Sequence, residues 1–257
     1  MKEKLLLLTF AMMIPLIATA QHKVFIPIET FDTKQKGRGK MTGWMWDAPN
    51  SKKKLDGYSN QKKRQILLIH MYGGSSQDWM LLIEKWRAQD FEADILAIDL
   101  RDRGKGSGSY VFIEDIQSAV AYLRSRQTPH ASAGVSIIAA GVGANGALQY
   151  ATASPQMAHI IDSLTLISPG QTFGEMPALE AIEHINNIPI LLIAARDEHH
   201  TYSTARDLLR KCKSMCSEFS VSGSGQGTDL LRSKYGMEVS QTITKFMLNP
   251  RSYGNTR

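Results

Sequence analysis

The sequence predicts an α/β fold with a mostly parallel central sheet. Short apolar, β-branched runs alternate with longer amphipathic stretches, which is the pattern of βαβ units. Several of the runs are followed at once by Gly, Ser or Asp clusters, as expected where loops at the carboxyl edge of a sheet build a site. The expected strands are Gly43–Trp46, Gln65–His70, Asp94–Asp99, Val135–Ala140, Ser163–Ser168, Pro189–Ala195 and Phe219–Ser222. The expected helices are Gln77–Ala88, Phe112–Ser125, Gly143–Thr152, Met176–His184, Tyr202–Lys213 and Thr228–Leu248.

The first 20 residues predict a secretory signal peptide. A charged start, Met1–Lys4, precedes the apolar run Leu5–Ile17, and an A-x-A cleavage motif ends at Ala20. The apolar run is shorter than the ~20 residues of a membrane-spanning helix, and it contains Pro15. We therefore expect an exported protein, periplasmic or extracellular, with a single domain over residues 21–257.

The formal charge of +6 is unevenly spread. Ten Lys and Arg residues fall between Lys34 and Arg64, against Asp47 and Asp56 alone. Such a run usually forms a solvated loop face, and the alternative is attraction to an anionic envelope surface, such as phospholipid or acidic glycan. Export argues against nucleic acid as a partner.

Cys212 and Cys216 are the only cysteines. A disulfide is permitted outside the cytoplasm, but the i, i+4 spacing falls in a helical-looking segment, so the sequence leaves their pairing open. Neither a C-x-x-C redox centre nor a cysteine-rich metal site is present.

The run Ile137–Leu148, IIAAGVGANGAL, contains the G-x-G-x-x-G spacing of a dinucleotide-binding loop. That loop belongs at the first strand-to-helix turn of its domain, with an acidic residue ending the next strand. Here two strong βα units precede it, and the nearest candidate, Asp162, comes before the next strand. We therefore expect no nucleotide cofactor.

Five segments instead resemble the α/β-hydrolase superfamily in their order along the chain, especially its dienelactone-hydrolase-like and small esterase-like members. The stretch HMYGG resembles the oxyanion loop H-G-x-G-G, and DLRDRGKG resembles the D-L-R-G-H-G stretch after the following strand. The DLRDRGKG stretch lies within Ala97–Gly106. The other three segments resemble the superfamily's sixth-strand, acid and histidine segments, and they are, in that order, Ser168–Gly170, Ala195–Glu198 and Gly223–Leu231. The resemblance covers about residues 60–245 and implies an α/β-hydrolase fold without a large cap domain.

On this register the superfamily's G-x-S-x-G elbow, written G-A-S-M-G-A-N in these relatives, lies over Ala139–Asn145, and the nucleophile position is Gly141. Ala139 and Gly143 keep the small residues that let strand and helix pack closely. Glycine has no hydroxyl, however, so no acyl-enzyme can form at Gly141.

The resemblance places the catalytic histidine at Gln226, whose carboxamide cannot accept a proton near neutral pH. Asp197 falls at the acid position, where its partner histidine is missing. The oxyanion donors would be the amides of Tyr72 and Val142, and Met71 stands where the family has glycine. These departures predict a vestigial triad.

The chemistry could have moved to other residues. Ser75, Ser76 and Ser168 lie near the predicted site, although the first two are better explained as the start of the helix at Gln77. His199 and His200 follow Asp197, where exposed loop histidines are the simpler interpretation. They are too close in sequence to Asp197 for an obvious metal site, and His70 is expected to make a structural hydrogen bond.

The favoured hypothesis is therefore a non-catalytic pseudo-hydrolase. Its cleft, enlarged by loss of the serine, would bind a small carboxylate or ester-like ligand, or its surface would bind a partner. The alternatives are an active carboxylic-ester hydrolase with a relocated nucleophile and an envelope-associated protein that uses the basic region. The sequence does not determine the oligomeric state.

Overall fold

The computed structural model describes residues 21–28, 40–48, 63–101, 109–126 and 131–253. The predicted signal peptide and most of the basic region between Lys34 and Arg64 lie outside these residues, so both remain predictions. Within the described part of the chain, no helix is long and apolar enough to cross a bilayer.

An eight-stranded sheet with the order β1-β2-β4-β3-β5-β6-β9-β10 forms the centre of the molecule. Strands β1 and β2 pair with their neighbours antiparallel, and all other pairs are parallel, so the predicted mostly parallel sheet is confirmed. The strands are β1 Gln21–Pro27, β2 Lys40–Trp46, β3 Lys63–Ile69, β4 Ala93–Asp99, β5 Ala131–Ala140, β6 Ile161–Ile167, β9 Ile190–Ala195 and β10 Cys216–Val221. A separate two-stranded hairpin pairs β7 Thr172–Phe173 with β8 Met176–Pro177.

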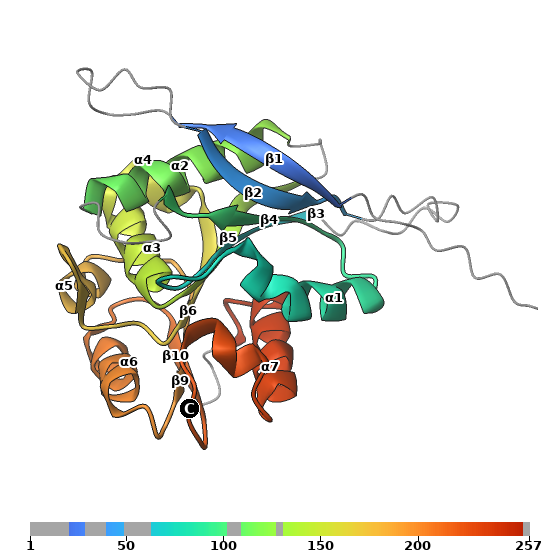
Figure 1. The fold of residues 1–257 in the computed structure, drawn as a ribbon. Helices are drawn as coiled ribbons and strands as arrows, with labels where there is room; N and C mark the ends of the chain where they lie inside the picture. The colour runs from blue at the N-terminus through green and yellow to red at the C-terminus, as the bar shows by residue number, and fades with distance from the viewer. Residues whose placement is uncertain (1–20, 29–39, 49–62, 102–108, 127–130, 254–257) are drawn as a thin grey trace, which may run out of the picture.

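Helices cover both faces of this sheet (Figure 1). Side chains of α2, α3, α5 and α6 join one apolar core, and those of α1 and α7 join the other. The helices are α1 Met80–Ala88, α2 Ser109–Ser125, α3 Val142–Ala153, α4 Pro155–His159, α5 Ala178–Glu183, α6 His199–Lys211 and α7 Gly236–Leu248, with the short 3₁₀ turns η1 Ser76–Trp79 and η3 Gly227–Leu231. No cap domain interrupts this arrangement among the described residues.

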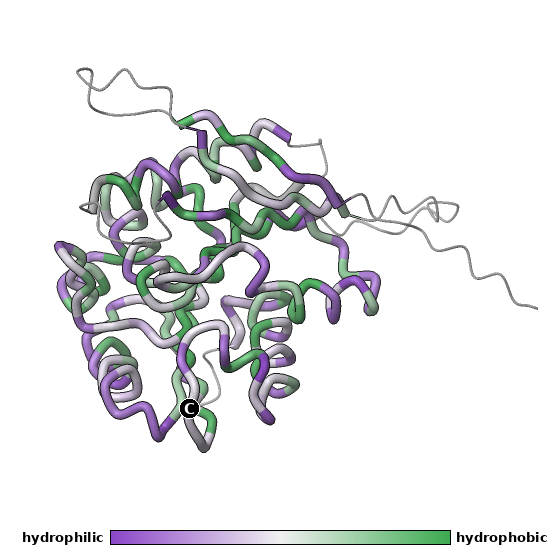
Figure 2. Tube along the Cα trace, viewed as in Figure 1, coloured by the Kyte–Doolittle hydropathy of each residue, from purple (hydrophilic) through white to green (hydrophobic). Residues whose placement is uncertain are grey.

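The two-residue period of each strand divides its side chains between these cores. In β3, Leu67 and Ile69 join the core beneath α2 and α3, whereas Ile66 and Leu68 join the core beneath α1 and α7. Strands buried on both faces read as continuous apolar runs, and hydrophobic colour follows the central strands in Figure 2, with hydrophilic residues on the outer turns of the helices.

The structure corrects several of the predicted elements. Strand β1 and helix α4 were not predicted. The helix expected over Thr228–Leu248 is divided into η3 and α7, because the chain turns between them, where the Gly236 amide donates to the Ser233 carbonyl oxygen at 2.9 Å. The segment expected to be helical from Met176 begins as strand β8, and α5 starts at Ala178.

Cys212 and Cys216 form a disulfide. Helix α6 ends at Lys211 and β10 begins at Cys216, so Cys212 directly follows the helix and Cys216 is the first residue of the strand, and the two cysteines do not share one helix. The bridge ties the end of α6 to the edge strand of the sheet.

Candidate functional site

The candidate site begins at the turn between β5 and α3. Gly141 has φ +53° and ψ −120°, a left-handed conformation that glycine adopts without steric cost. Its amide donates to the Ile167 carbonyl oxygen at 2.9 Å, and its own carbonyl oxygen accepts from the Ala144 amide at 3.0 Å. The predicted strand-to-helix turn at Gly141 is therefore present.

Gly143, two residues later, lets α3 approach β3 closely. A Cβ at Gly143 would lie 2.7 Å from the His70 carbonyl oxygen and 2.8 Å from the Ile69 side chain. The expected requirement for a small residue at this position is confirmed, because no side chain fits without moving backbone.

Met71 occupies the space beside the turn. A Cβ at Gly141 would lie 2.9 Å from the Met71 Cβ, and a Cβ at Gly227 would lie 2.6 Å from the Met71 Sδ. The Met71 side chain therefore extends from Gly141 to Gly227, and we call these three residues the methionine wedge. The sequence predicted a cleft enlarged by loss of the serine, and this is wrong at Gly141, because Met71 takes up the space that a nucleophile's Cβ would need.

The loop that carries Met71 is held by a buried histidine. The His70 Nε2 accepts from the Leu100 amide at 3.0 Å, which leaves the proton on Nδ1 to donate to the Met71 carbonyl oxygen at 2.7 Å. The Gly74 amide donates to the same oxygen at 3.0 Å. The structural role predicted for His70 is confirmed, and the backbone of Met71 is fixed from two sides.

The predicted oxyanion donors flank this loop. Tyr72 is 58% exposed, and Val142 is the buried first residue of α3. Within the described residues neither amide donates a hydrogen bond. Both N–H groups are thus available to a ligand oxygen, and their joint use remains a prediction.

Gln226, at the histidine position, pairs with a carboxylate other than the predicted one. Its Nε2 donates to the Glu198 Oε2 at 2.8 Å, and the Gly225 amide donates to Glu198 Oε1 at 3.2 Å. The hydrogen bond from Gln226, followed by that from Gly225, holds the pKa of Glu198 below its usual value. Asp197 is exposed and reaches this region through its amide, which donates to the Gly223 carbonyl oxygen at 3.1 Å. The carboxylate that Gln226 contacts is therefore that of Glu198 and not that of Asp197, which stands at the acid position of the resemblance.

The three serines considered as replacement nucleophiles have structural contacts. Ser168 is buried with φ +51°, and its hydroxyl oxygen accepts from the Gly227 amide at 2.9 Å. Ser75 is the N-cap residue of η1, and its amide donates to the Asp78 carboxylate at 3.0 Å. Ser76 is buried, and its amide donates to the Asp99 carboxylate at 2.8 Å. The expected place of Ser75 and Ser76 at a helix start is confirmed.

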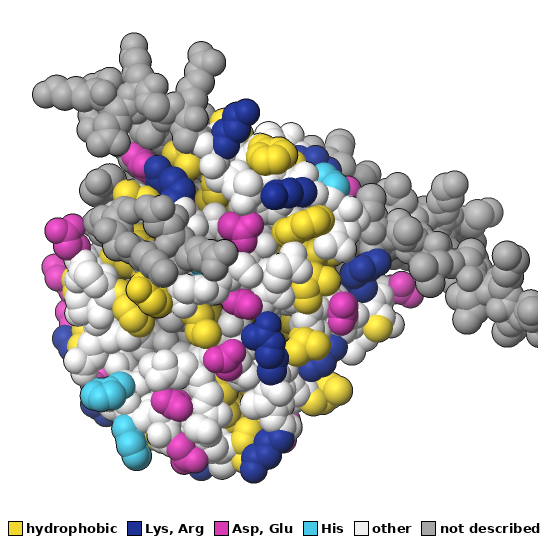
Figure 3. All heavy atoms as spheres, viewed as in Figure 1, with side chains coloured by type: hydrophobic (Ala, Val, Ile, Leu, Met, Phe, Trp, Pro, Cys, Tyr) yellow, Lys and Arg dark blue, Asp and Glu magenta, His cyan; other side chains and the backbone are white. Residues whose placement is uncertain are grey.

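The histidines considered as replacement bases lie on the outside of the molecule. His199 and His200 are exposed in the first turn of α6, and histidine side chains lie at the surface over α6 in Figure 3. Within the described ranges, no three His, Cys, Asp or Glu residues come together as metal ligands. The structure thus brings Gly141, Met71 and Gly227 together.

Asn145, in the elbow segment, has a structural role that the sequence did not reveal. Its Nδ2 donates to the carbonyl oxygens of Gly170 and Met176 at 3.0 and 2.9 Å, and its Oδ1 accepts from the Gly170 amide at 3.1 Å. The side chain is fully buried. These three bonds join α3 to the loop after β6.

Comparison with known proteins finds similarity in structure alone. No protein-family model matches the chain, and no curated protein matches it. The dienelactone hydrolase of Anabaena variabilis superposes with a TM-score of 0.63 at 16% identity, covering 90% of this chain and 99% of that one. The esterase Est1E of Butyrivibrio proteoclasticus superposes with a TM-score of 0.64 at 13% sequence identity, covering 88% of this chain and 98% of that one.

The Pyrococcus furiosus esterase Pf2001 gives a TM-score of 0.64 at 16% identity, covering 90% of this chain and 93% of that one. Similarity at this level of identity establishes architecture and leaves activity to be argued from the site. This chain has the α/β-hydrolase fold, and its predicted resemblance to dienelactone-hydrolase-like and esterase-like proteins is confirmed at the level of the fold.

Proposed function

We propose that this chain is an exported, non-catalytic α/β-hydrolase-fold protein that acts by binding a small ligand or a partner. The observation that carries the proposal is the methionine wedge. At the position where these hydrolases carry a serine, the chain has glycine, and the Met71 Cβ lies within 2.9 Å of where a side chain would begin. The site therefore lacks both the hydroxyl and the space for it.

The histidine position supports the same proposal. The Gln226 side-chain amide donates to the Glu198 carboxylate. A carboxamide does not act as a general base, so this pair orients no proton acceptor. Acyl transfer needs a nucleophile, a base within hydrogen-bond reach of it and an orienting group. Gly141, Gln226 and Glu198 supply at most the third of these.

Export is proposed from the sequence of residues 1–20. Strand β1 begins at Gln21, directly after the predicted cleavage site. Cleavage there would leave all eight strands of the sheet intact. N-terminal sequencing of the protein recovered from the periplasm or medium should begin at Gln21, and a protein that retains Met1 in the cytoplasm would contradict this part of the proposal.

Catalytic inactivity is tested by labelling and restoration. The mature protein should neither react with a fluorophosphonate probe nor hydrolyse short p-nitrophenyl esters. The triple variant Gly141→Ser, Met71→Gly, Gln226→His should gain probe labelling, because it supplies the hydroxyl, the space and an imidazole. Gly141→Ser with Gln226→His, which keeps Met71, is the matched control and should label less. Labelling of the unaltered protein that disappears on changing Ser75, Ser76 or Ser168 to Ala would overturn the proposal.

A further inference from the structure

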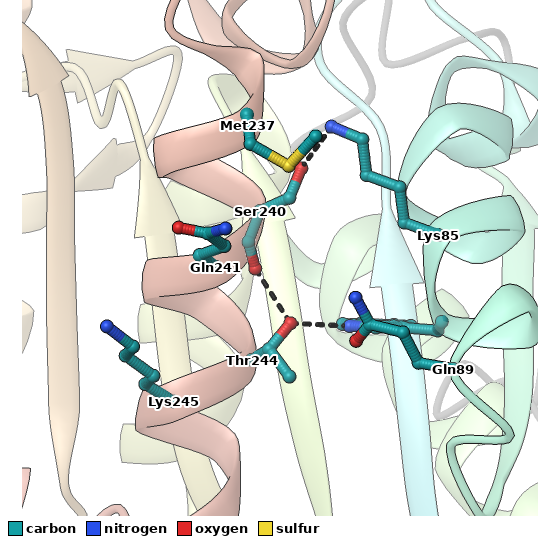
Figure 4. A pocket seen from close by; sticks show the side chains of 8 residues that line it. Lys85, Gln89, Met237, Ser240, Gln241, Thr244 and Lys245 are labelled. Carbon is teal, nitrogen blue, oxygen red and sulfur yellow. Dashed lines mark hydrogen bonds between the residues drawn. The ribbon is translucent and has the colours of Figure 1, made fainter.

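A pocket of about 310 Å³ lies between α1 and α7, formed by residues outside the vestigial triad. The residues of α7 that line it recur at the spacing of one helix face, and those of α1 face them (Figure 4). The lining residues are Lys85, Trp86, Gln89, Met237, Ser240, Gln241, Thr244 and Lys245. Two lysines are included and no acidic residue.

The ammonium group of Lys85 is held in a fixed position. Its Nζ donates to the Gly236 carbonyl oxygen and to the Ser240 hydroxyl oxygen, each at 3.0 Å. Both acceptors are neutral, so the positive charge of Lys85 is not compensated by an ion pair within the described residues. An ammonium group has three N–H donors, and one of them is left for a ligand.

Lys245 also lines the pocket, at the end far from Lys85. In Figure 4 its side chain extends away from Lys85 and Gln89. Lys245 is exposed and forms no salt bridge within the described residues. The fixed positive charge of the pocket is therefore that of Lys85.

The apolar part of the lining consists of Met237 and Trp86. Met237 is 57% exposed and stands at one end of the pocket. The Trp86 indole forms part of the wall, and its Nε1 is already satisfied by the Thr244 hydroxyl at 2.8 Å. Methionine is a flexible side chain that adapts to irregular apolar ligands, so this end of the pocket suits a hydrocarbon chain or ring.

We infer that the pocket between α1 and α7 binds an organic carboxylate with an apolar body. The carboxylate would accept from the remaining N–H of Lys85, while its apolar part would lie against Met237 and Trp86. Charge complementarity decides the ligand class, because the ammonium group of Lys85, held by neutral acceptors alone among the described residues, favours an anion over a neutral or cationic ligand. This inference is independent of whether the vestigial triad is active.

Sodium octanoate is the probe for a test by two-dimensional ¹H–¹⁵N NMR on the mature protein. Millimolar octanoate should shift the Trp86 indole N–H resonance and the amide resonances of Met237–Lys245. Loss of a charge-assisted hydrogen bond of 1.5–3 kcal/mol corresponds to at least about a tenfold change in Kd, so Lys85→Gln should weaken binding by about that factor. Lys85→Arg should retain most of the affinity, and Met237→Ala should weaken octanoate but not acetate.

The controls separate charge from apolar contact. Lys211→Gln removes an exposed α6 lysine that pairs with Glu183 outside the pocket, and it should leave the octanoate Kd unchanged. Octanol binding as tightly as octanoate would overturn the inference, because the charge of Lys85 would then be unused. Inorganic phosphate binding as tightly would overturn the apolar part, and the absence of shifts at the pocket with octanoate would overturn the whole.

Discussion

The methionine wedge predicts that a side chain at Gly141 destabilises the fold in a way that depends on the Met71 Cβ. Gly141→Ser places a residue with a Cβ at φ +53°, which costs about 1–3 kcal/mol of backbone strain. The 2.9 Å approach to the Met71 Cβ adds an overpacking cost of about 1–3 kcal/mol. We expect Gly141→Ser to lower the free energy of unfolding by about 2–6 kcal/mol, as the sum of these two terms.

Two substitutions at Met71 separate these terms. Met71→Gly removes the Cβ and should recover the overpacking part, about 1–3 kcal/mol, when combined with Gly141→Ser in a double-mutant cycle. Met71→Ala keeps the Cβ and should recover little. At Gly227 the two substitutions should act nearly alike, because a Cβ there meets the Met71 Sδ at 2.6 Å, so Met71→Ala should already relieve most of the contact introduced by Gly227→Ala.

Urea unfolding followed by circular dichroism supplies the free energies for both cycles. The reasoning would be refuted if Met71→Gly and Met71→Ala coupled equally to Gly141→Ser, because the contact would then not involve the Cβ. A Gly141→Ser protein more stable than the unaltered one would refute both the strain and the contact.

Two further predictions concern stability. Burial, which outweighs the lowering effect of Arg101, raises the pKa of Asp115 in α2 from 3.8 to about 6. Protonated Asp115 therefore contributes its full stabilisation of the folded state below pH 4, and this stabilisation is lost as pH rises through 6. At 1.36 kcal/mol per pKa unit this stabilisation is about 3 kcal/mol. The difference in free energy of unfolding between the unaltered protein and Asp115→Asn should change by about that amount between pH 4 and pH 7 in urea titrations. A difference that stays the same would contradict the raised pKa of Asp115. The disulfide closes a five-residue loop, and the loop-closure entropy of such a loop corresponds to a stabilisation of about 2 kcal/mol. The double variant Cys212→Ser, Cys216→Ser should therefore lower the free energy of unfolding, measured by calorimetry, by about that amount. An unchanged free energy of unfolding would show that the disulfide does not stabilise the fold.

The sequence predicted the buried strands well because they are long apolar runs. All six residues of strand β9 are apolar and buried, and a run of this length rich in Ile and Leu favours a buried strand over a helix of ten or more residues. Strand β1 was missed, because Val24 and Ile26 are buried while Lys23 and Phe25 are exposed, and this short alternation directly follows the apolar leader. The break before α7 is a turn in which the Gly236 amide donates to the Ser233 carbonyl oxygen, and the hydrophobic periodicity does not reveal this turn.

The sequence predicted the backbone turn of the candidate site but not the side-chain contacts around it. The position of Gly141 followed from the order of motifs, and its positive φ agrees with that register. The contacts of Met71 with residues 141 and 227 join three loops distant in sequence, and only the folded chain brings them together. Glu198 was passed over for its neighbour Asp197, because the direction of a side chain at a strand end depends on how the loop turns.

The methionine wedge also bears on how such a protein can change over generations. A serine restored at position 141 alone would lower stability through its contact with Met71 and would still face Gln226, so it would bring a loss without a compensating activity. A serine at position 141 therefore fits only if Met71 shrinks before or together with the change at Gly141. On the proposed function, this packing makes a catalytic serine difficult to introduce by single substitutions, which leaves the fold free to diverge toward recognition.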